Sequence, residues 1–510
     1  MFKRKSSLVL LSLLIVLAIT LSACGTGDGA SKDPENDSLI VAQGAHPASL
    51  DPHQSNDQPS SRVNKQIYES LVNATVDMEL EPGIAESWEP VDDITWEFKI
   101  REGVLFHNGD ELTAHDVVFS LERMLDSPEV AHIVEAIDTV EAEDDNTVII
   151  TTHEPFAPIL AHLSHTAASI FSEAAVTEAG DDYHNQPIGT GPYMFQSQEA
   201  GDSVTLERFD DYWGDPADIK TVVFRNIPEG TNRTIGLETG EVDVAYEIEP
   251  IDKSTVTEHE DLELIEEPSL STQYIGFNIN KEPFDDIDVR RAINHAIDVE
   301  EIIDVVLEGS GNVANGPVNP SVFGYNEELE GYEYDPDLAM ELLEDAGHAD
   351  GLEIQLWTND NPVRVRIAEM VQEQLRLVGV TVNIEQVEWS AYLERTGQGE
   401  HDMFILGWVT VTGDADYGLY ALFHSSQHGG AGNRTFFDNA EVDELLEIGR
   451  TTADEDARYD AYARAQEIIV EEAPQIFLYF DTQNVGIQNY VTGFELNPAG
   501  HHSIYGVSFE

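Results

Sequence analysis

Cysteine and positive charge are both scarce in this sequence. Cys24 is the only cysteine, which excludes internal disulfides and cysteine-ligated metal clusters. Lys and Arg total 25 against 98 Asp and Glu, for a formal net charge of −73, and this balance argues against nucleic acid as a partner. The chain also contains no Gly-x-Ser-x-Gly elbow and no His-Glu-x-x-His sequence, so the motifs of two large hydrolase classes are missing.

Long hydrophobic runs are absent beyond the N-terminus. Basic residues 3–5 precede an apolar run from Leu8 to Leu21, which is followed by small residues and Cys24. The run is shorter than the roughly 20 apolar residues that span a bilayer, so residues 1–23 are predicted to be a cleaved lipoprotein signal peptide. Cys24 would carry the lipid and anchor the protein to the outer face of the cell membrane. The small, polar residues 24–37 are predicted to form a flexible tether.

The excess of acid must lie on a folded surface. Hydrophobic residues make up 41% of the chain and recur in periodic segments, which argues against disorder. Self-repulsion among so many carboxylates destabilises a compact state, but a Debye length of roughly 3 Å at 1 M salt screens it. Our hypothesis is an acidic surface adapted to a hypersaline exterior.

The remaining chain is too long for one core and alternates between strand-like and helix-like patterns, so two or more α/β domains are expected. Apolar spacing and end signals predict a few elements in detail. They are a strand at Leu39–Ala42, a helix at Ser60–Leu71, a helix after the capping box at Thr113, a helix between Pro362 and Gly379, a strand at Val380–Val387 and a helix at Asp454–Glu472.

Several ordered motifs carry a family resemblance over nearly all of residues 39–510. They are Ile67–Val72, Ile84–Glu89, Thr95–Gly109, Leu112–Arg123, Pro187–Tyr193, Asp211–Gly214, Gly240–Asp243, Gly276–Asn278, Val289–Ala292 and Gly407–Trp408. In this series the chain resembles the peptide and nickel class of ABC-transporter solute-binding proteins, which includes the dipeptide and oligopeptide receptors.

The resemblance implies an α/β fold like that of periplasmic binding proteins of class II, or cluster C. Two lobes are joined by hinge strands, and lobe one carries an extra inserted subdomain. Lobe one is expected at residues 38–67, 186–271 and 483–510, the inserted subdomain at residues 68–185, and lobe two at residues 272–482.

Most of the motif residues have a structural interpretation. Trp88, Trp96, Phe98 and Phe106 are predicted core aromatics of the subdomain. Gly189–Tyr193 is predicted to shape a turn before a strand. His107, His115 and Asp116 could suggest a metal site, but Asp116 is better explained as part of a helix start, and no metal site or cofactor is predicted.

The predicted ligand-binding segment follows Gly407. In peptide receptors of this class, the third residue after the tryptophan is typically an Asp that pairs with the ligand ammonium, and Val411 stands there instead. Asp414 or Asp416 could replace it, and Arg364 could replace the arginine that binds the ligand carboxylate in some dipeptide receptors. The predicted ligand-binding residues are Trp408, Val409, Thr410, Val411, Thr412, Asp414, Asp416, Tyr417, Asn361 and Arg364.

The resemblance implies a monomeric, non-enzymatic receptor that captures di- or oligopeptides outside the cell and delivers them to ABC permease subunits and their ATPase. Two lobes closing on an extended peptide can pair with its backbone whatever its side chains are. Because the ammonium clamp is missing, glutathione, a nickel chelate or an oligosaccharide remains an alternative ligand. A secreted hydrolase with paired carboxylates is a further alternative, supported only by the abundance of acids.

Overall fold

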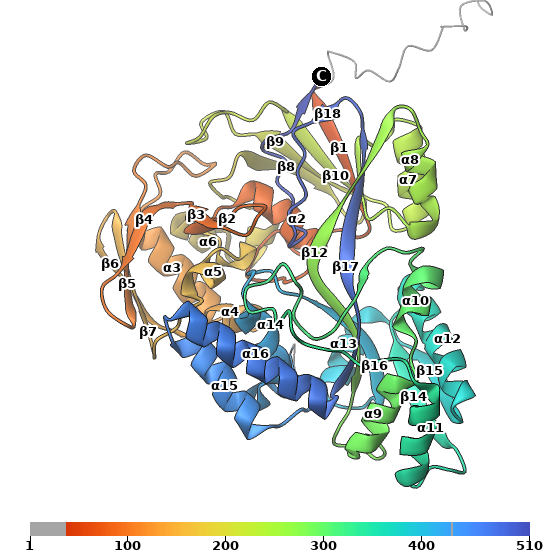
Figure 1. Ribbon diagram of the computed structural model, residues 1–510. Coiled ribbons are helices and arrows are strands. Elements are labelled where there is room, and N and C mark those ends of the chain that lie inside the picture. The colour runs from red at the N-terminus through yellow and green to blue at the C-terminus, as the bar shows by residue number, and fades with distance from the viewer. Residues whose placement is uncertain (1–36, 430–431) are drawn as a thin grey trace, which may run out of the picture.

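The computed structural model describes residues 37–429 and 432–510 (Figure 1). The predicted signal peptide, Cys24 and nearly all of the predicted tether lie outside the described residues. Within the described ranges, no helix combines the length and apolarity that a membrane span requires. A large sheet runs through two lobes, and a smaller sheet forms part of a subdomain beside them.

The large sheet has 11 strands, and two long ones cross from lobe to lobe. Its main path is β15 (Val380–Gln386), β14 (Leu352–Thr358), β16 (Met403–Val409), β12 (Leu262–Phe277), β17 (Gln475–Gln488), β11 (Val244–Tyr246), β1 (Ser38–Gln43), β10 (Thr221–Asn226), β9 (Ser203–Arg208) and β8 (Tyr193–Glu199). The short β13 (Asn312–Val313) also pairs with β17.

The antiparallel pair β12 and β17 forms the hinge. The end near Leu262 pairs beside lobe one, and the end near Gly276 pairs inside lobe two. The register shifts between the pairs Pro268–Thr482 and Thr272–Phe480, so the two strands form a bulge midway between the lobes. Bulges bend a strand and redirect side chains, which suits a crossing point.

Lobe one packs strands β1, β8, β9, β10 and β11 against the C-terminal segment, and one apolar cluster includes Leu39, Phe224, Ile487 and Val507. Its other elements are α2 (Gln58–Ile67), α7 (Gly230–Glu238), η3 (Pro250–Asp252), α8 (Lys253–Thr257), β18 (Val491–Thr492) and β19 (Ser508–Phe509).

The subdomain has its own apolar cluster, which includes Phe98, Phe106 and Ile150 with Trp88 and Trp96 packed at its edge. Its four-stranded sheet runs β4 (Ala85–Pro90), β5 (Thr95–Ile100), β7 (Thr147–Thr152), β6 (Ile137–Asp144). The other elements are β2 (Val72–Ala74), β3 (Leu80–Pro82), α3 (Ala114–Leu125), α4 (Ala131–Val134), α5 (Ile159–Leu163), η1 (Thr166–Ala168), α6 (Glu173–Ala179) and η2 (Gly180–Asn185).

Lobe two packs helices on both sides of β14, β15 and β16, around two large apolar clusters. The helices are α9 (Ile287–His295), α10 (Val299–Val306), α11 (Pro336–Asp345), α12 (Pro362–Leu377), α13 (Trp389–Gly397), α14 (Ala415–Phe423), η4 (Ser425–Gln427), α15 (Ala440–Thr451) and α16 (Glu455–Glu472). Helices α15 and α16 lie beside the subdomain in Figure 1.

Most of the elements predicted in detail are confirmed. The first strand is β1, and the capping box starts α3, where the Thr113 N–H donates to the Asp116 carboxylate at 3.0 Å. The predicted helix and strand after Pro362 are α12 and β15. The last predicted helix is α16, which Asp454 caps.

The predicted end of the helix at Ser60–Leu71 is wrong, because α2 stops at Ile67 and Tyr68 is extended. The helix ends there because the turn after Pro187 packs against its last carbonyl group. The Gly191 N–H donates to the Ile67 carbonyl at 2.9 Å, and a Cβ on Gly189 would stand 2.0 Å from that same oxygen. A second segment of the chain therefore takes the place of the next helical turn. This contact supports the structural interpretation of both glycines.

Candidate functional site

A cavity of about 460 Å³ lies between the lobes, beside the hinge. Lobe one contributes Arg62 and Glu247, and lobe two contributes Asn361, Arg364 and Val409. The hinge strand β17 supplies Tyr479, Asp481 and Thr482. The cavity therefore brings together three of the predicted ligand-binding residues, and its size suits a small molecule.

Arg364 enters this cavity from the first turn of α12. The Asn361 side chain caps the helix by accepting the Val363 and Arg364 N–H groups at 3.0 and 3.1 Å. The Arg364 guanidinium makes only long hydrogen bonds, to the amide oxygens of Asn359 at 3.5 Å and Gln273 at 3.4 Å. Among the described residues no carboxylate lies within ion-pair distance of it, so a ligand carboxylate would meet a half-buried, available cation.

On the opposite wall, Arg62 and Glu247 form an ion pair at 2.8 Å. Arg62 holds the pKa of Glu247 below its usual value. Glu247 has a positive φ of 57°, and its carbonyl accepts a hydrogen bond from Arg233 at 2.7 Å. Positive φ at a non-glycine residue is uncommon, so the neighbouring contacts must hold this backbone in place.

Asp481 lies at the hinge bulge, on the wall between the two lobes. Burial raises the pKa of its carboxyl to about 6, and the Thr482 N–H, Arg364 and Lys253 offset only part of that effect. The carboxyl is half-buried, and within the described ranges no Lys or Arg stands within ion-pair distance of it. Asp481 is therefore a carboxylate whose charge the protein itself compensates poorly.

The predicted loop after Gly407 begins where β16 ends, at Val409. The Thr410 N–H donates to the Leu270 carbonyl at 3.0 Å, which fixes the loop on the hinge strand β12. Val411 lines a small cavity of about 30 Å³ with His165 and His501. Thr412 is buried, and its hydroxyl accepts the Asp414 N–H at 3.3 Å.

Trp408 and Tyr417 pack together, with their ring centroids 5.4 Å apart. Tyr417 is 7% exposed and belongs to the apolar cluster of the subdomain, although it lies on α14 of lobe two. Burial raises the pKa of Tyr417 to about 12. These two rings therefore join lobe two to the subdomain, and neither lines the larger cavity.

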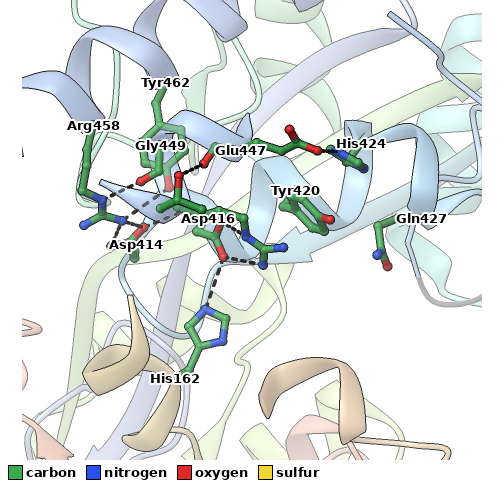
Figure 2. Close-up of polar contacts among 12 residues, drawn as sticks. His162, Asp414, Asp416, Tyr420, His424, Gln427, Glu447, Gly449, Arg458 and Tyr462 are labelled. Atoms are coloured by element: carbon green, nitrogen blue, oxygen red, sulfur yellow. Dashed lines mark hydrogen bonds and ion pairs between the residues drawn. The ribbon is translucent and has the colours of Figure 1, made fainter. Parts of the chain in front are cut away.

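Asp414 and Asp416 are both held by arginines of lobe two (Figure 2). Arg458 donates to both oxygens of Asp414 at 2.9 and 2.8 Å. Arg450 donates to both oxygens of Asp416, each at 3.2 Å. Burial raises the pKa of Asp414 despite Arg458, whereas Arg450 and His162 lower that of Asp416 against the effect of burial. In this arrangement, neither carboxylate is available as a simple substitute for the absent clamp.

His162 of the subdomain reaches across to lobe two. Its Nε2 lies 3.6 Å from the Asp416 carboxylate, and both side chains are almost fully buried (Figure 2). Nearby, the Ala157 N–H donates to the Arg450 carbonyl at 2.8 Å. The Arg450 guanidinium also lies 5.1 Å from the Phe156 ring centroid. The subdomain and lobe two therefore share two polar contacts and a cation–π contact.

The sequence prediction missed Arg62, Glu247 and Asp481 as cavity residues. Asp481 had a local signal, since it directly follows the apolar run Ile476–Phe480. A charged residue directly after an apolar run often faces a cavity or a boundary. Arg62 and Glu247 had no comparable signal, because their pairing depends on segments far apart in the chain. Within the described ranges, no cluster of three or more potential metal ligands occurs.

Comparisons with known proteins agree with this architecture. The family described as "Bacterial extracellular solute-binding proteins, family 5 Middle" matches residues 79–430. The dipeptide-binding protein of Escherichia coli (strain K12) is 33% identical in an alignment of 476 residues that covers 87% of this chain and 89% of that protein. The glutathione-binding protein GsiB of Pectobacterium atrosepticum is 33% identical in an alignment of 499 residues that covers 95% of this chain and 96% of that protein.

A solved structure gives the same result in three dimensions. The ABC transporter-associated periplasmic binding protein DppA from Helicobacter pylori, in complex with the peptide STSA, has a TM-score of 0.85 and 31% identity, with 93% of this chain and 98% of that chain covered. The expected class II, two-lobed α/β fold is thereby confirmed, as is the predicted family. The chain belongs to the family 5 extracellular solute-binding proteins and is a substrate-binding component of an ABC importer.

Proposed function

We propose that this receptor captures short peptides outside the cell and delivers them to its permease. The observation that carries the proposal is Arg364, a cation without a carboxylate partner among the described residues, facing a cavity that both lobes line. In a chain with 98 acidic residues, a cavity-facing arginine free of ion pairs is unusual. A peptide carboxylate would meet it as a charge-assisted, bidentate hydrogen-bond partner.

The hinge couples ligand binding at this site to closure of the two lobes. The cavity walls come from both lobes, so a ligand that touches both stabilises the closed arrangement over the open one. Closure expels water and strengthens the polar contacts to the ligand. The permease would then recognise the closed form, and the receptor itself would carry out no chemical reaction.

Calorimetry of the purified soluble domain against di-, tri- and tetrapeptides tests the proposal. We expect saturable binding of at least one length class, weakened by Arg364→Met. Arg366→Met is the matched control, since Arg366 is exposed on the same helix and outside the cavity wall. Absence of binding across all three lengths would reject the peptide proposal.

Glutathione is the second candidate, because a relative named for glutathione binding covers 95% of this chain. Glutathione is a modified tripeptide with two carboxylates, and Arg364 suits one of them. The same calorimetric series should include it. Binding of glutathione with no response to ordinary peptides would favour this candidate.

We further propose the predicted domain division, a monomeric receptor and a lipid on Cys24 that holds it at the outer face of the membrane. Support for the anchor comes from the apolar run and small residues before Cys24. Cell fractionation tests it: Cys24→Ser should move the protein from the membrane to the soluble fraction. Retention of that variant on the membrane would contradict lipid anchoring.

A further inference from the structure

We infer that Asp481 binds the terminal ammonium group of the ligand, so that the receptor selects short zwitterionic peptides over peptides with a blocked N-terminus. The inference rests on the proposed function. It assigns to the hinge strand the role that the loop position Val411 cannot fill.

Asp481 lies at the bulge between the hinge strands. The Pro268–Thr482 and Thr272–Phe480 pairs leave residues 269–271 of β12 facing Asp481 across the bulge. The Ser269 hydroxyl donates to the Asp481 backbone carbonyl at 3.1 Å, which fixes the backbone there. The side chain of Asp481 lines the 460 Å³ cavity rather than joining a lobe core. A bulge places a side chain outside the regular alternation of the strand, and here it faces the space between the lobes.

Three other carboxylates near the cleft have an arginine partner. Asp414 is bound by Arg458, Asp416 by Arg450 and Glu247 by Arg62. Asp481 has no such counter-cation in the described part of the chain, although burial disfavours its charged form. Buried charges are normally paired, so a half-buried carboxylate that lines a cavity and has no partner is a candidate binding site for a cationic group. A primary ammonium group from the ligand would supply it.

Arg364 and Asp481 carry opposite charges and line the same cavity. A ligand with an ammonium at one end and a carboxylate at the other would neutralise both side chains at once. The cavity is small, so this pairing fits a short peptide and not a long chain passing through the cleft. The chemical class is therefore a short zwitterion with free termini.

Two peptides that differ only at the N-terminus test the assignment: alanyl-alanine and N-acetyl-alanyl-alanine, or the best-bound dipeptide and its acetylated form. Wild-type protein should bind the free amine roughly 10- to 100-fold more tightly, as expected for a charge-assisted hydrogen bond. Asp481→Asn keeps the side-chain shape and removes the charge. It should bind the two forms with nearly equal affinity, and its affinity for the acetylated form should stay within about 3-fold of wild type.

The matched control is Glu267→Gln, which removes one exposed carboxylate from β12 opposite Gln483 and outside the cavity wall. It should keep the full preference for the free amine. An unchanged preference in Asp481→Asn overturns the inference but leaves peptide binding intact. If wild-type protein binds neither form at any peptide length, the proposed function itself fails. Circular dichroism verifies that each variant is folded, and Asp481→Glu, which retains a carboxylate, should restore part of the preference.

Discussion

Removing His162 should weaken ligand binding although this side chain lies outside the larger cavity. His162 belongs to the subdomain and Asp416 to lobe two, so we expect their interaction to be lost when the lobes open and to stabilise only the closed arrangement. The distance of 3.6 Å between Nε2 and the carboxylate is longer than that of a good hydrogen bond. We therefore assign the contact about 1 kcal/mol of stabilisation of the closed arrangement, less than a well-formed hydrogen bond to a charged group contributes. His162→Ala should therefore weaken affinity about 5-fold, since about 1.4 kcal/mol corresponds to a factor of ten.

In the variant, Asp416 keeps its two hydrogen bonds from Arg450, so its carboxylate stays paired and no further loss of stability is expected. The His162 Nδ1–H also donates to the Ile133 carbonyl oxygen at 2.6 Å, a contact inside the subdomain that affects overall stability and not closure. With Nδ1 protonated, the attraction of Nε2 to the Asp416 carboxylate requires a second proton, on Nε2. Titration calorimetry far below the melting temperature separates the two effects. X-ray scattering of the unliganded protein should show a larger mean radius in the variant.

His115→Ala is the matched control, because His115 is exposed on α3 of the same subdomain. It should leave affinity and scattering unchanged. Equal or tighter ligand binding by a folded His162→Ala protein would refute the reasoning, since it would show that the contact does not favour closure.

Three other perturbations have defined outcomes. Arg458→Met leaves the buried Asp414 carboxylate unpaired and should lower the free energy of unfolding by about 3–5 kcal/mol, measured by chemical denaturation, with partial recovery when Asp414→Asn is added. Because the pKa of Asp481 is raised to about 6 in the folded protein, its protonated form favours folding, and stability should fall as pH rises from about 4 through 6. Asp481→Asn should remove that part of the pH dependence in calorimetric melting curves, and an unaltered profile would contradict it. Finally, a net charge of −73 predicts a melting temperature that rises steeply between 50 mM and molar salt, and equal stability at both would oppose the hypersaline hypothesis.

Sequence patterns predicted the local elements and the family, and the confirmed cases share a physical reason. The helices after Thr113, Pro362 and Asp454 carry their own end signals, so their starts depend on neighbouring residues alone. The end of α2 lacked such a signal. It is set by the contact of Gly191 with Ile67, across more than a hundred residues, and no local pattern encodes that.

The candidate site was predictable only in part for the same reason. Asn361 and Arg364 could be placed by resemblance, and both line the cavity. The ion pairs of Asp414 and Asp416 join α14 to the helices that follow it, so the sequence alone gave no sign that both carboxylates were already bound. The ligand-binding roles of the predicted residues stay predictions until ligands are measured.

The shared hinge strand also bears on how the protein is made. β17 pairs with β11 in lobe one and with β12 in both lobes, yet it begins only at Gln475 of a 510-residue chain. Neither lobe can complete its sheet before Gln475 and the strand that follows it have been synthesised. A chain cut before Gln475 would therefore lack a strand in both lobes, and would leave two defective lobes rather than one intact half.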